Sequence, residues 1–204
     1  MAHQHHHHRN HGNPEDLDAY IARMEGEDRA AWQRPDEIVA MLQLRPGDTV
    51  ADVGAGPGYF TLRLARAVGP LGRVFAVEVV PEMVAALRHR LDRARLGNVT
   101  IVTGRDDDPL LAPASCDAVL VVNTFHHFPD GVAYLRRLAA SLVPGGRILD
   151  VDFHRRELPV GPPVEHKIAR EDFLDAAERA GLALVGERTD LPYQYAVLLR
   201  PRSG

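Results

Sequence analysis

The chain of 204 residues contains a single cysteine, Cys116. One thiol cannot form an internal disulfide, and it excludes zinc sites built from several cysteines as well as redox chemistry that needs a Cys-x-x-Cys pair. No signal-like apolar run occurs in the first fourteen residues. We therefore expect a cytoplasmic protein.

Long hydrophobic runs are also missing. The longest, such as Ala118–Val122, has about five residues, against the ~18 that a membrane-spanning helix needs. Positive charge is not in excess, because 24 Lys and Arg face 28 Asp and Glu and the formal net charge is -4. Without a general positive field, a protein attracts phosphate backbones weakly. We expect neither a membrane span nor a nucleic-acid partner.

The composition that remains, 45% hydrophobic and 25% charged, is that of a globular protein with a sizeable core. We expect one domain over residues 15–204, which begins with a helical cap at about residues 15–45. A disordered, His-rich tail is expected over residues 1–14. Its histidines are His3, His5, His6, His7, His8 and His11. Neutral imidazoles bind Ni, Cu or Zn wherever they cluster, and we assign no metal to the function on that basis.

Apolar strands alternate with amphipathic helices along most of the chain, which predicts a parallel sheet covered on both faces. The expected strands are Thr49–Val53, Arg73–Val77, Val99–Val102, Ala118–Val122, Arg147–Val151, Leu182–Arg188 and Tyr195–Leu199, the last two antiparallel. The expected helices are one over residues 15–24, one that begins at Pro35, and then Tyr59–Val68, Pro81–Arg95, Val132–Val143 and Glu171–Ala180. Prolines within His154–Pro163 predict a long loop.

The most informative stretch runs from Val50 to Phe60, where a strand leads into a glycine turn and then a helix. Gly54 and Gly56 let a ligand approach the backbone, and the helix offers unpaired N–H groups. A dinucleotide fingerprint would need a third glycine at the position of Tyr59. Asp52 before the turn would repel a pyrophosphate but suits a cationic amino group. The turn therefore predicts a ligand that carries positive charge.

The stretch Asp52-Val-Gly-Ala-Gly-Pro-Gly58 resembles motif I of the class I S-adenosylmethionine-dependent methyltransferases, and the resemblance extends over roughly residues 31–199. It implies a Rossmann-like, doubly wound α/β fold with a seven-stranded sheet of order 3-2-1-4-5-7-6, strand 7 antiparallel and helices on both faces. The implied cofactor is S-adenosyl-L-methionine, with S-adenosyl-L-homocysteine as product. In a chain this short we expect a small-molecule methyl acceptor, and a monomer or homodimer.

Further positions match this family in order and spacing. Glu78, at the end of the second strand, stands where the family places an acid that accepts from both ribose hydroxyls. Asp106 and Asp107, after the third strand, are the candidates for the adenine amino group, although Arg105 stands where the family usually has its aspartate. The cofactor-binding residues implied by the resemblance are Asp52, Gly54, Ala55, Gly56, Gly58, Tyr59, Glu78, Val79, Met83, Asp106, Asp107 and Asn123.

Asn123, His126 and His127 follow the fourth strand, in the part of the family fold that flanks the transferable methyl group. His126 is the candidate catalytic residue, as a general base that removes a proton from the acceptor. A structural role for His126 is the alternative, because a sulfonium is already activated and many methyl transfers need no base. The candidate acceptor contacts are Tyr20, Trp32, His127 and Tyr193, although Tyr20 and Trp32 could simply pack on the sheet.

Two other function classes stay open at this point. One is a nicotinamide-dependent oxidoreductase on a Rossmann sheet, against which Asp52 and Tyr59 both count. The other is a non-catalytic protein that senses the cofactor or binds metal through the His-rich tail.

Overall fold

The computed structural model describes residues 19, 21–22 and 26–202. The expected tail over residues 1–14 and the candidate Tyr20 lie outside the described residues, as does most of the helix expected over residues 15–24. No helix in the described part is long and apolar enough to cross a membrane.

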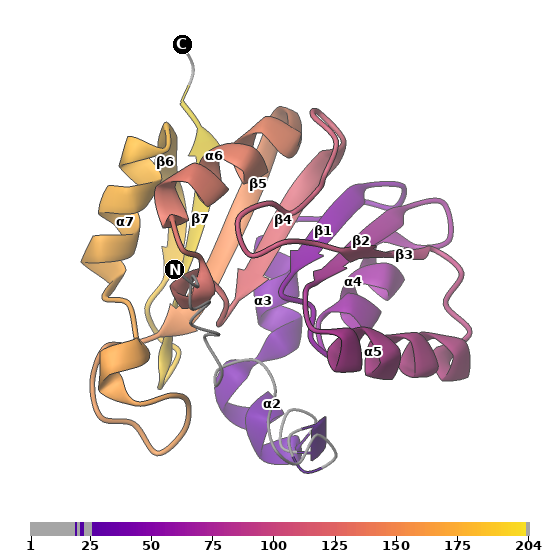
Figure 1. Ribbon diagram of the computed structural model, residues 1–204, viewed down its shortest axis with the longest axis horizontal. Coiled ribbons are helices and arrows are strands. Elements are labelled where there is room, and N and C mark those ends of the chain that lie inside the picture. The colour runs from indigo at the N-terminus through magenta and orange to yellow at the C-terminus, as the bar shows by residue number, and fades with distance from the viewer. Residues whose placement is uncertain (1–18, 20, 23–25, 203–204) are drawn as a thin grey trace, which may run out of the picture.

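Seven strands of the described chain form one sheet in the order β3-β2-β1-β4-β5-β7-β6, as predicted (Figure 1). β1 to β5 run parallel, whereas β7 is antiparallel to both of its neighbours. The strands are β1 (Thr49–Val53), β2 (Arg73–Glu78), β3 (Val99–Thr103), β4 (Cys116–Val122), β5 (Leu142–Phe153), β6 (Leu182–Arg188) and β7 (Gln194–Pro201).

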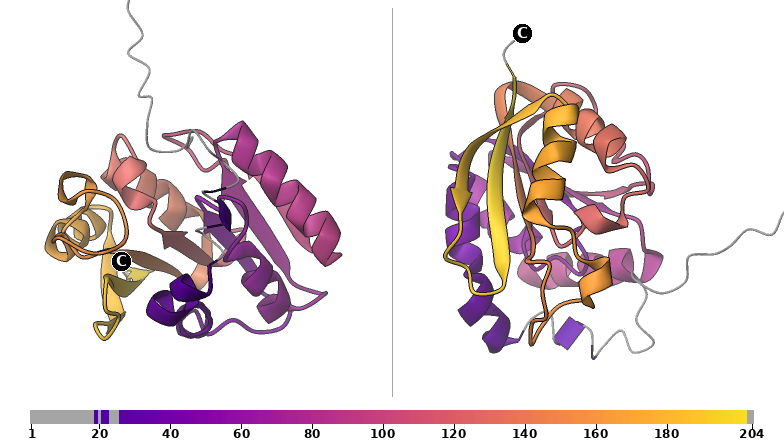
Figure 2. Two further views of the ribbon diagram at one scale, coloured as in Figure 1. Left: turned by 90° about the horizontal axis from the view of Figure 1, so that it is seen from below. Right: turned by 90° about the vertical axis from the view of Figure 1, so that its left-hand side faces the viewer.

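Helices cover both faces of the sheet, and the two groups are seen on opposite sides of the strands in Figure 2. The helices are α2 (Glu27–Gln33), α3 (Pro35–Met41), α4 (Thr61–Val68), α5 (Pro81–Ala94), α6 (Gly131–Ser141) and α7 (Arg170–Arg179), with short 3-10 helices η1 (Phe125–His127) and η2 (Val164–His166). α3 and α4 pack on one face through Ile38 and Leu64. α6 and α7 pack on the other through Leu138 and Phe173. The strands are therefore buried from both sides, which explains their nearly continuous apolar sequences.

Several element boundaries differ from the expectations. Helix α2 was not predicted; it is separated from α3 by Arg34, whose left-handed conformation turns the chain before Pro35 begins the next helix. α4 begins at Thr61 rather than Tyr59. β5 begins at Leu142 rather than Arg147, because Leu142 already pairs with Cys116 on β4. The next pair is Ala118 with Arg147, so the residues between Leu142 and Arg147 form an irregularity in the strand.

The parallel strands place their carboxyl ends along one edge of the sheet. The glycine turn follows β1, Glu78 ends β2, Asn123 follows β4 and Phe153 ends β5. In an open α/β sheet this edge is where ligands bind. The predicted loop over residues 154–163 is confirmed and leaves the sheet at the same edge.

Removal of the Phe173 ring tests the packing under α7. Phe173 is fully buried and contacts the Phe125 ring at a centroid distance of 4.7 Å. We expect Phe173→Ala to lower the free energy of unfolding by about 3–5 kcal/mol in urea titrations, because a large cavity remains. The matched control is Leu71→Ala, since Leu71 is 90% exposed and its loss should change stability by no more than about 0.5 kcal/mol. Equal losses in the two variants would contradict this packing.

Candidate functional site

The first and last glycines of the turn, Gly54 and Gly58, pack so closely on their neighbours that a side chain at either position would clash. Gly54 has a φ of +75°, and a Cβ atom there would overlap the Oγ1 atom of Thr124 and lie 2.5 Å from its Cγ2. A Cβ atom on Gly58 would lie 2.5 Å from Leu87. Position 54 thus requires a glycine, both for its positive φ and for the close approach of Thr124 after β4.

Asp52 lies behind this turn and is almost completely buried. Burial raises the pKa of its carboxyl to about 6, and a hydrogen bond from Thr61 Oγ1 at 2.6 Å partly opposes that shift. The positive charge of Arg29, on α2, also acts to lower this pKa. A cation that binds beside Asp52 would favour its ionised form.

Glu78 is held by backbone donors at the end of β2. Its Oε1 accepts from the N–H groups of Val79 at 2.8 Å and Val80 at 2.9 Å, and its Oε2 accepts from Gly56 N–H at 2.7 Å. The carboxylate therefore faces the glycine turn in a fixed position. A vicinal diol would meet a two-oxygen acceptor there.

The other predicted cofactor residues near the turn lie in different surroundings. Ala55 and Met83 are buried, whereas Val79 is 40% exposed at the edge of the sheet. The Tyr59 ring belongs to the core on the α3 and α4 face, and guanidinium groups of Arg29 and Arg63 lie 4.0 and 4.3 Å from its centre. The Tyr59 ring is therefore held by packing and by two guanidinium groups, and its contact with a ligand in the turn stays a prediction.

Asp106 and Asp107 form the exposed tip of a tight turn after β3. Two backbone hydrogen bonds between Arg105 and Asp108 close this turn. The Oδ2 atom of Asp108 lies 3.5 Å from Nε of Arg137, so an ion pair connects this turn to helix α6. Within the described residues, neither Asp106 nor Asp107 has a hydrogen bond to the rest of the site. Their contact with adenine stays a prediction.

Asn123 ends a chain of side-chain hydrogen bonds that crosses the sheet edge. Arg29 Nε donates to Gln33 Oε1 at 2.6 Å, and Gln33 Nε2 donates to Gln194 Oε1 at 3.0 Å. Gln194 Nε2 donates to Asn123 Oδ1 at 2.6 Å. Both glutamines are fully buried. Arg29, Gln33 and Gln194 were not predicted as site residues. No local motif marks them, because Gln33 and Gln194 are 161 positions apart in the sequence.

His126 lies on the other face of the same edge, paired with a buried carboxylate. Its Nδ1 is 3.3 Å from Asp152 Oδ2, and Asp152 Oδ1 accepts from Phe153 N–H at 2.7 Å. The rings of His126 and His127 lie 4.1 Å apart between centroids. A histidine oriented by a buried carboxylate is the arrangement that a general base needs. The sequence analysis singled out His126 but missed Asp152.

Asp150 lies two residues before Asp152 on the same face of β5 and is also buried. Among residues 26–202, no group forms a hydrogen bond with its Oδ2 atom. Burial, together with the charge of Asp152, raises the pKa of Asp150 well above its usual value. The neutral form of Asp150 is therefore favoured.

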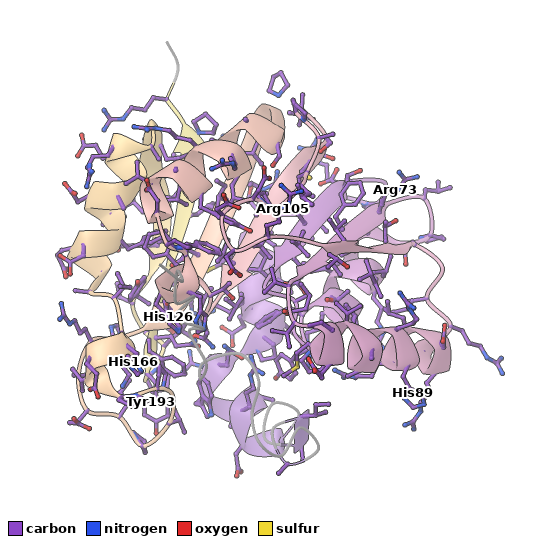
Figure 3. The ribbon with its side chains drawn as sticks, viewed as in Figure 1. Arg73, His89, Arg105, His126, His166 and Tyr193 are labelled. Carbon is purple, nitrogen blue, oxygen red and sulfur yellow. The ribbon has the colours of Figure 1, made fainter. Side chains whose placement is uncertain are left out.

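An aromatic cluster stands beside these groups. The Trp32 ring lies 5.8 Å from Phe153 and 5.8 Å from Tyr193 between centroids. Gly161, in the proline-rich loop, packs so closely on Phe153 that a Cβ atom there would lie 2.9 Å from the ring. Figure 3 shows His126 and Tyr193 at the same edge of the molecule. The structure thus brings Trp32 and Tyr193 together. Their contact with an acceptor stays a prediction.

The chain is similar to known methyltransferases in sequence and in fold. Residues 50–146 match a family model described as "Methyltransferase domain". A SAM dependent methyltransferase from Aquifex aeolicus, known as a crystal structure, aligns with 91% of this chain and 98% of its own at a TM-score of 0.84 and 24% identity.

Two curated relatives carry more specific names. A protein-L-isoaspartate O-methyltransferase of Methanothrix thermoacetophila is 36% identical over 53% of this chain and 49% of its own length. A 27-O-demethylrifamycin SV methyltransferase of Amycolatopsis mediterranei is 30% identical over 71% of this chain and 53% of its own length. The chain thus spans about half the length of the curated relatives that it matches.

Substitution of Gly54 tests the close packing of the turn on β4. Gly145 also has a positive φ, of +81°, but a Cβ atom there would meet nothing within 4 Å. We expect Gly145→Ala to lose about 1–2 kcal/mol of stability from backbone strain alone, and Gly54→Ala to lose about 1–3 kcal/mol more from the overlap with Thr124.

The measurement is urea unfolding of both variants and of Gly54→Ala combined with Thr124→Ala. The double variant should recover part of the loss, since it removes the overlapping atoms. If Gly54→Ala were no less stable than Gly145→Ala, the close approach would be wrong.

Proposed function

We propose that the chain transfers the methyl group of S-adenosylmethionine to a small-molecule nucleophile and releases S-adenosylhomocysteine. The match of residues 50–146 to a methyltransferase domain supports this proposal. The observation that carries this proposal is the pair of buried carboxylates, Asp52 and Glu78, on either side of a glycine turn in which a side chain at Gly54 would overlap Thr124. Such a pair repels phosphates but suits a ligand with an ammonium group and a ribose diol.

Each end of the cofactor has a matching group at the carboxyl edge. Asp52 lies where it can stabilise the ammonium group of the methionine part, and Arg29 supplies positive charge for the adjoining carboxylate, since its charge already acts on Asp52. Glu78 accepts from the ribose hydroxyls beside Gly56. Val79 offers an exposed apolar surface at the same edge, suited to the adenine ring.

The protein's main contribution to the chemistry is alignment, because the sulfonium is already an activated electrophile. A nucleophile that carries a proton at rest must also lose it. The His126 and Asp152 pair lies at the carboxyl edge and can accept that proton. Trp32, Phe153 and Tyr193 form an apolar wall for the acceptor.

The acceptor is proposed as a small molecule on two grounds. The loop over residues 154–163 packs through Gly161 on the Phe153 ring of the aromatic wall, and the charge balance of -4 gives no field for a nucleic acid. A cytoplasmic monomer or homodimer is proposed with it, and residues 15–204 as a single domain. A nicotinamide site is disfavoured, because the Asp52 carboxylate lies directly behind the turn that would hold a pyrophosphate.

Calorimetric titration of the full chain with S-adenosylhomocysteine tests the cofactor site without knowledge of the acceptor. We expect binding, and a loss of about 1–3 kcal/mol of binding free energy in Glu78→Gln, which removes a charged acceptor from the diol. The control is Asp175→Asn, an exposed carboxylate on α7. An affinity unchanged by Glu78→Gln would place the cofactor elsewhere.

The raised pKa of Asp52 predicts how this affinity depends on pH. In the ligand-free protein Asp52 ionises near pH 6, and a bound ammonium favours the ionised form. The affinity for S-adenosylhomocysteine should therefore rise between pH 5 and pH 7, with release of a proton on binding at the lower pH.

Titrations in buffers of different ionisation enthalpy measure that proton. Asp52→Asn should bind more weakly and with a flatter pH profile. A wild-type affinity that does not change with pH would contradict the role of Asp52.

The base role of His126 is tested once an acceptor has been found by screening with a labelled methyl donor. We expect His126→Gln to lower kcat by about 10²–10⁴-fold, since proton removal is lost, and to leave the affinity for S-adenosylhomocysteine within about twofold. If stability and cofactor affinity fell together instead, His126 would be a structural residue.

A further inference from the structure

The hydrogen-bond chain from Arg29 to Asn123 has a fixed direction. A guanidinium can donate but not accept, so the Gln33 atom that faces Arg29 must be the oxygen. Gln33 therefore turns its nitrogen to Gln194, which must accept with its oxygen. Gln194 in turn donates to Asn123 Oδ1. The side-chain amide orientations, which are ambiguous for an isolated amide, are thus set in sequence by the arginine.

The Asn123 carboxamide lies beside the glycine turn. Its neighbour Thr124 packs directly on Gly54, and its own backbone N–H donates to Val151 on β5 at 2.8 Å. Because Oδ1 is turned to Gln194, the polar atom on the other side of the carboxamide is Nδ2, which can only donate. Hydrogen-bond donors are therefore presented at the end of β4, next to the site assigned to the cofactor.

We propose that this relay, formed by Arg29, Gln33, Gln194 and Asn123, selects an oxygen nucleophile over an amine as the methyl acceptor. The inference rests on the proposed function. An oxygen that has lost its proton accepts hydrogen bonds from Asn123 Nδ2, whereas an amine must donate its own N–H groups and would face a second donor.

The transfer balances with the groups at hand. The hydroxyl or carboxyl proton of the acceptor passes to the His126 imidazole, and an oxygen lone pair forms the new C–O bond. The C–S bond of the sulfonium breaks with its electron pair left on sulfur. Asn123 keeps its protons throughout and is a positioning residue.

Gln33→Glu tests the relay from a distance, on α2. A carboxylate at this position accepts from Arg29 and also from Gln194, so Gln194 must turn its oxygen toward Asn123. Asn123 then donates inward with Nδ2 and presents Oδ1 to the ligand. The substitution reverses the direction of the relay without a change at the turn, and the ion pair with Arg29 compensates the buried charge.

The probes are S-adenosylhomocysteine and sinefungin, an analogue with an amino group near the position of the transferable methyl. Wild-type protein offers that amine a donor, so we expect a weak preference for sinefungin or none. In Gln33→Glu the ratio of the two Kd values should shift by about tenfold in favour of sinefungin, the effect of one hydrogen bond to a charged group. Gln33→Met, which leaves Asn123 without a fixed direction, should give an intermediate ratio.

A merely structural role of Gln33 would weaken both ligands equally, and an unchanged ratio in folded Gln33→Glu would overturn the proposal. If Gln33→Glu does not fold, Gln194→Glu reverses the same relay one step closer and must give the same shift. Folded wild-type protein that binds neither ligand would remove the proposed function, and this inference with it. Binding of S-adenosylhomocysteine with an unchanged ratio would remove the inference alone.

Discussion

The close approach of the glycine turn after β1 to Thr124 at the end of β4 fixes the geometry of the whole carboxyl edge. With no Cβ atom at Gly54, the two neighbouring strands bring their ends into contact. Asp52 is buried behind this contact, and Gly56 reaches the Glu78 carboxylate on the other side. The proposed ligand site is therefore shaped by packing of the backbone, with two buried carboxylates beside it.

Because of the pleat of the strands, the polar side chains at the ends of β5 and β7 point to the two opposite faces of the sheet. Asp152 pairs in register with Tyr195, and Phe153 with Gln194. Since successive side chains point to opposite faces, Asp152 reaches His126 on the α6 and α7 side, while Gln194 reaches Gln33 on the α2 side. The His126–Asp152 pair and a row of oriented amides thus flank the same strand ends from opposite faces of the sheet.

Local patterns were enough to predict most strands, the glycine turn and the places of Asp52 and Glu78 beside it, because each depends on residues close in sequence, whereas the strand order followed only from the resemblance to a known family. Helix α2 was missed, since a left-handed Arg34 ends it where no glycine marks a stop. Gln33, Gln194 and Asp152 were missed because their roles arise only when distant elements meet. For Asp106 and Asp107, the resemblance predicts a contact with adenine. Both residues lie on an exposed turn, and this contact stays a prediction.

The most direct test of the account is a crystal structure of the full chain grown with S-adenosylhomocysteine. We predict the ribose hydroxyls on Glu78, the ammonium group beside Asp52 and the sulfur directed toward the end of β4, with Asn123 Oδ1 still bonded to Gln194. A nucleoside bound away from the glycine turn, or no ligand at concentrations well above the calorimetric Kd, would contradict it.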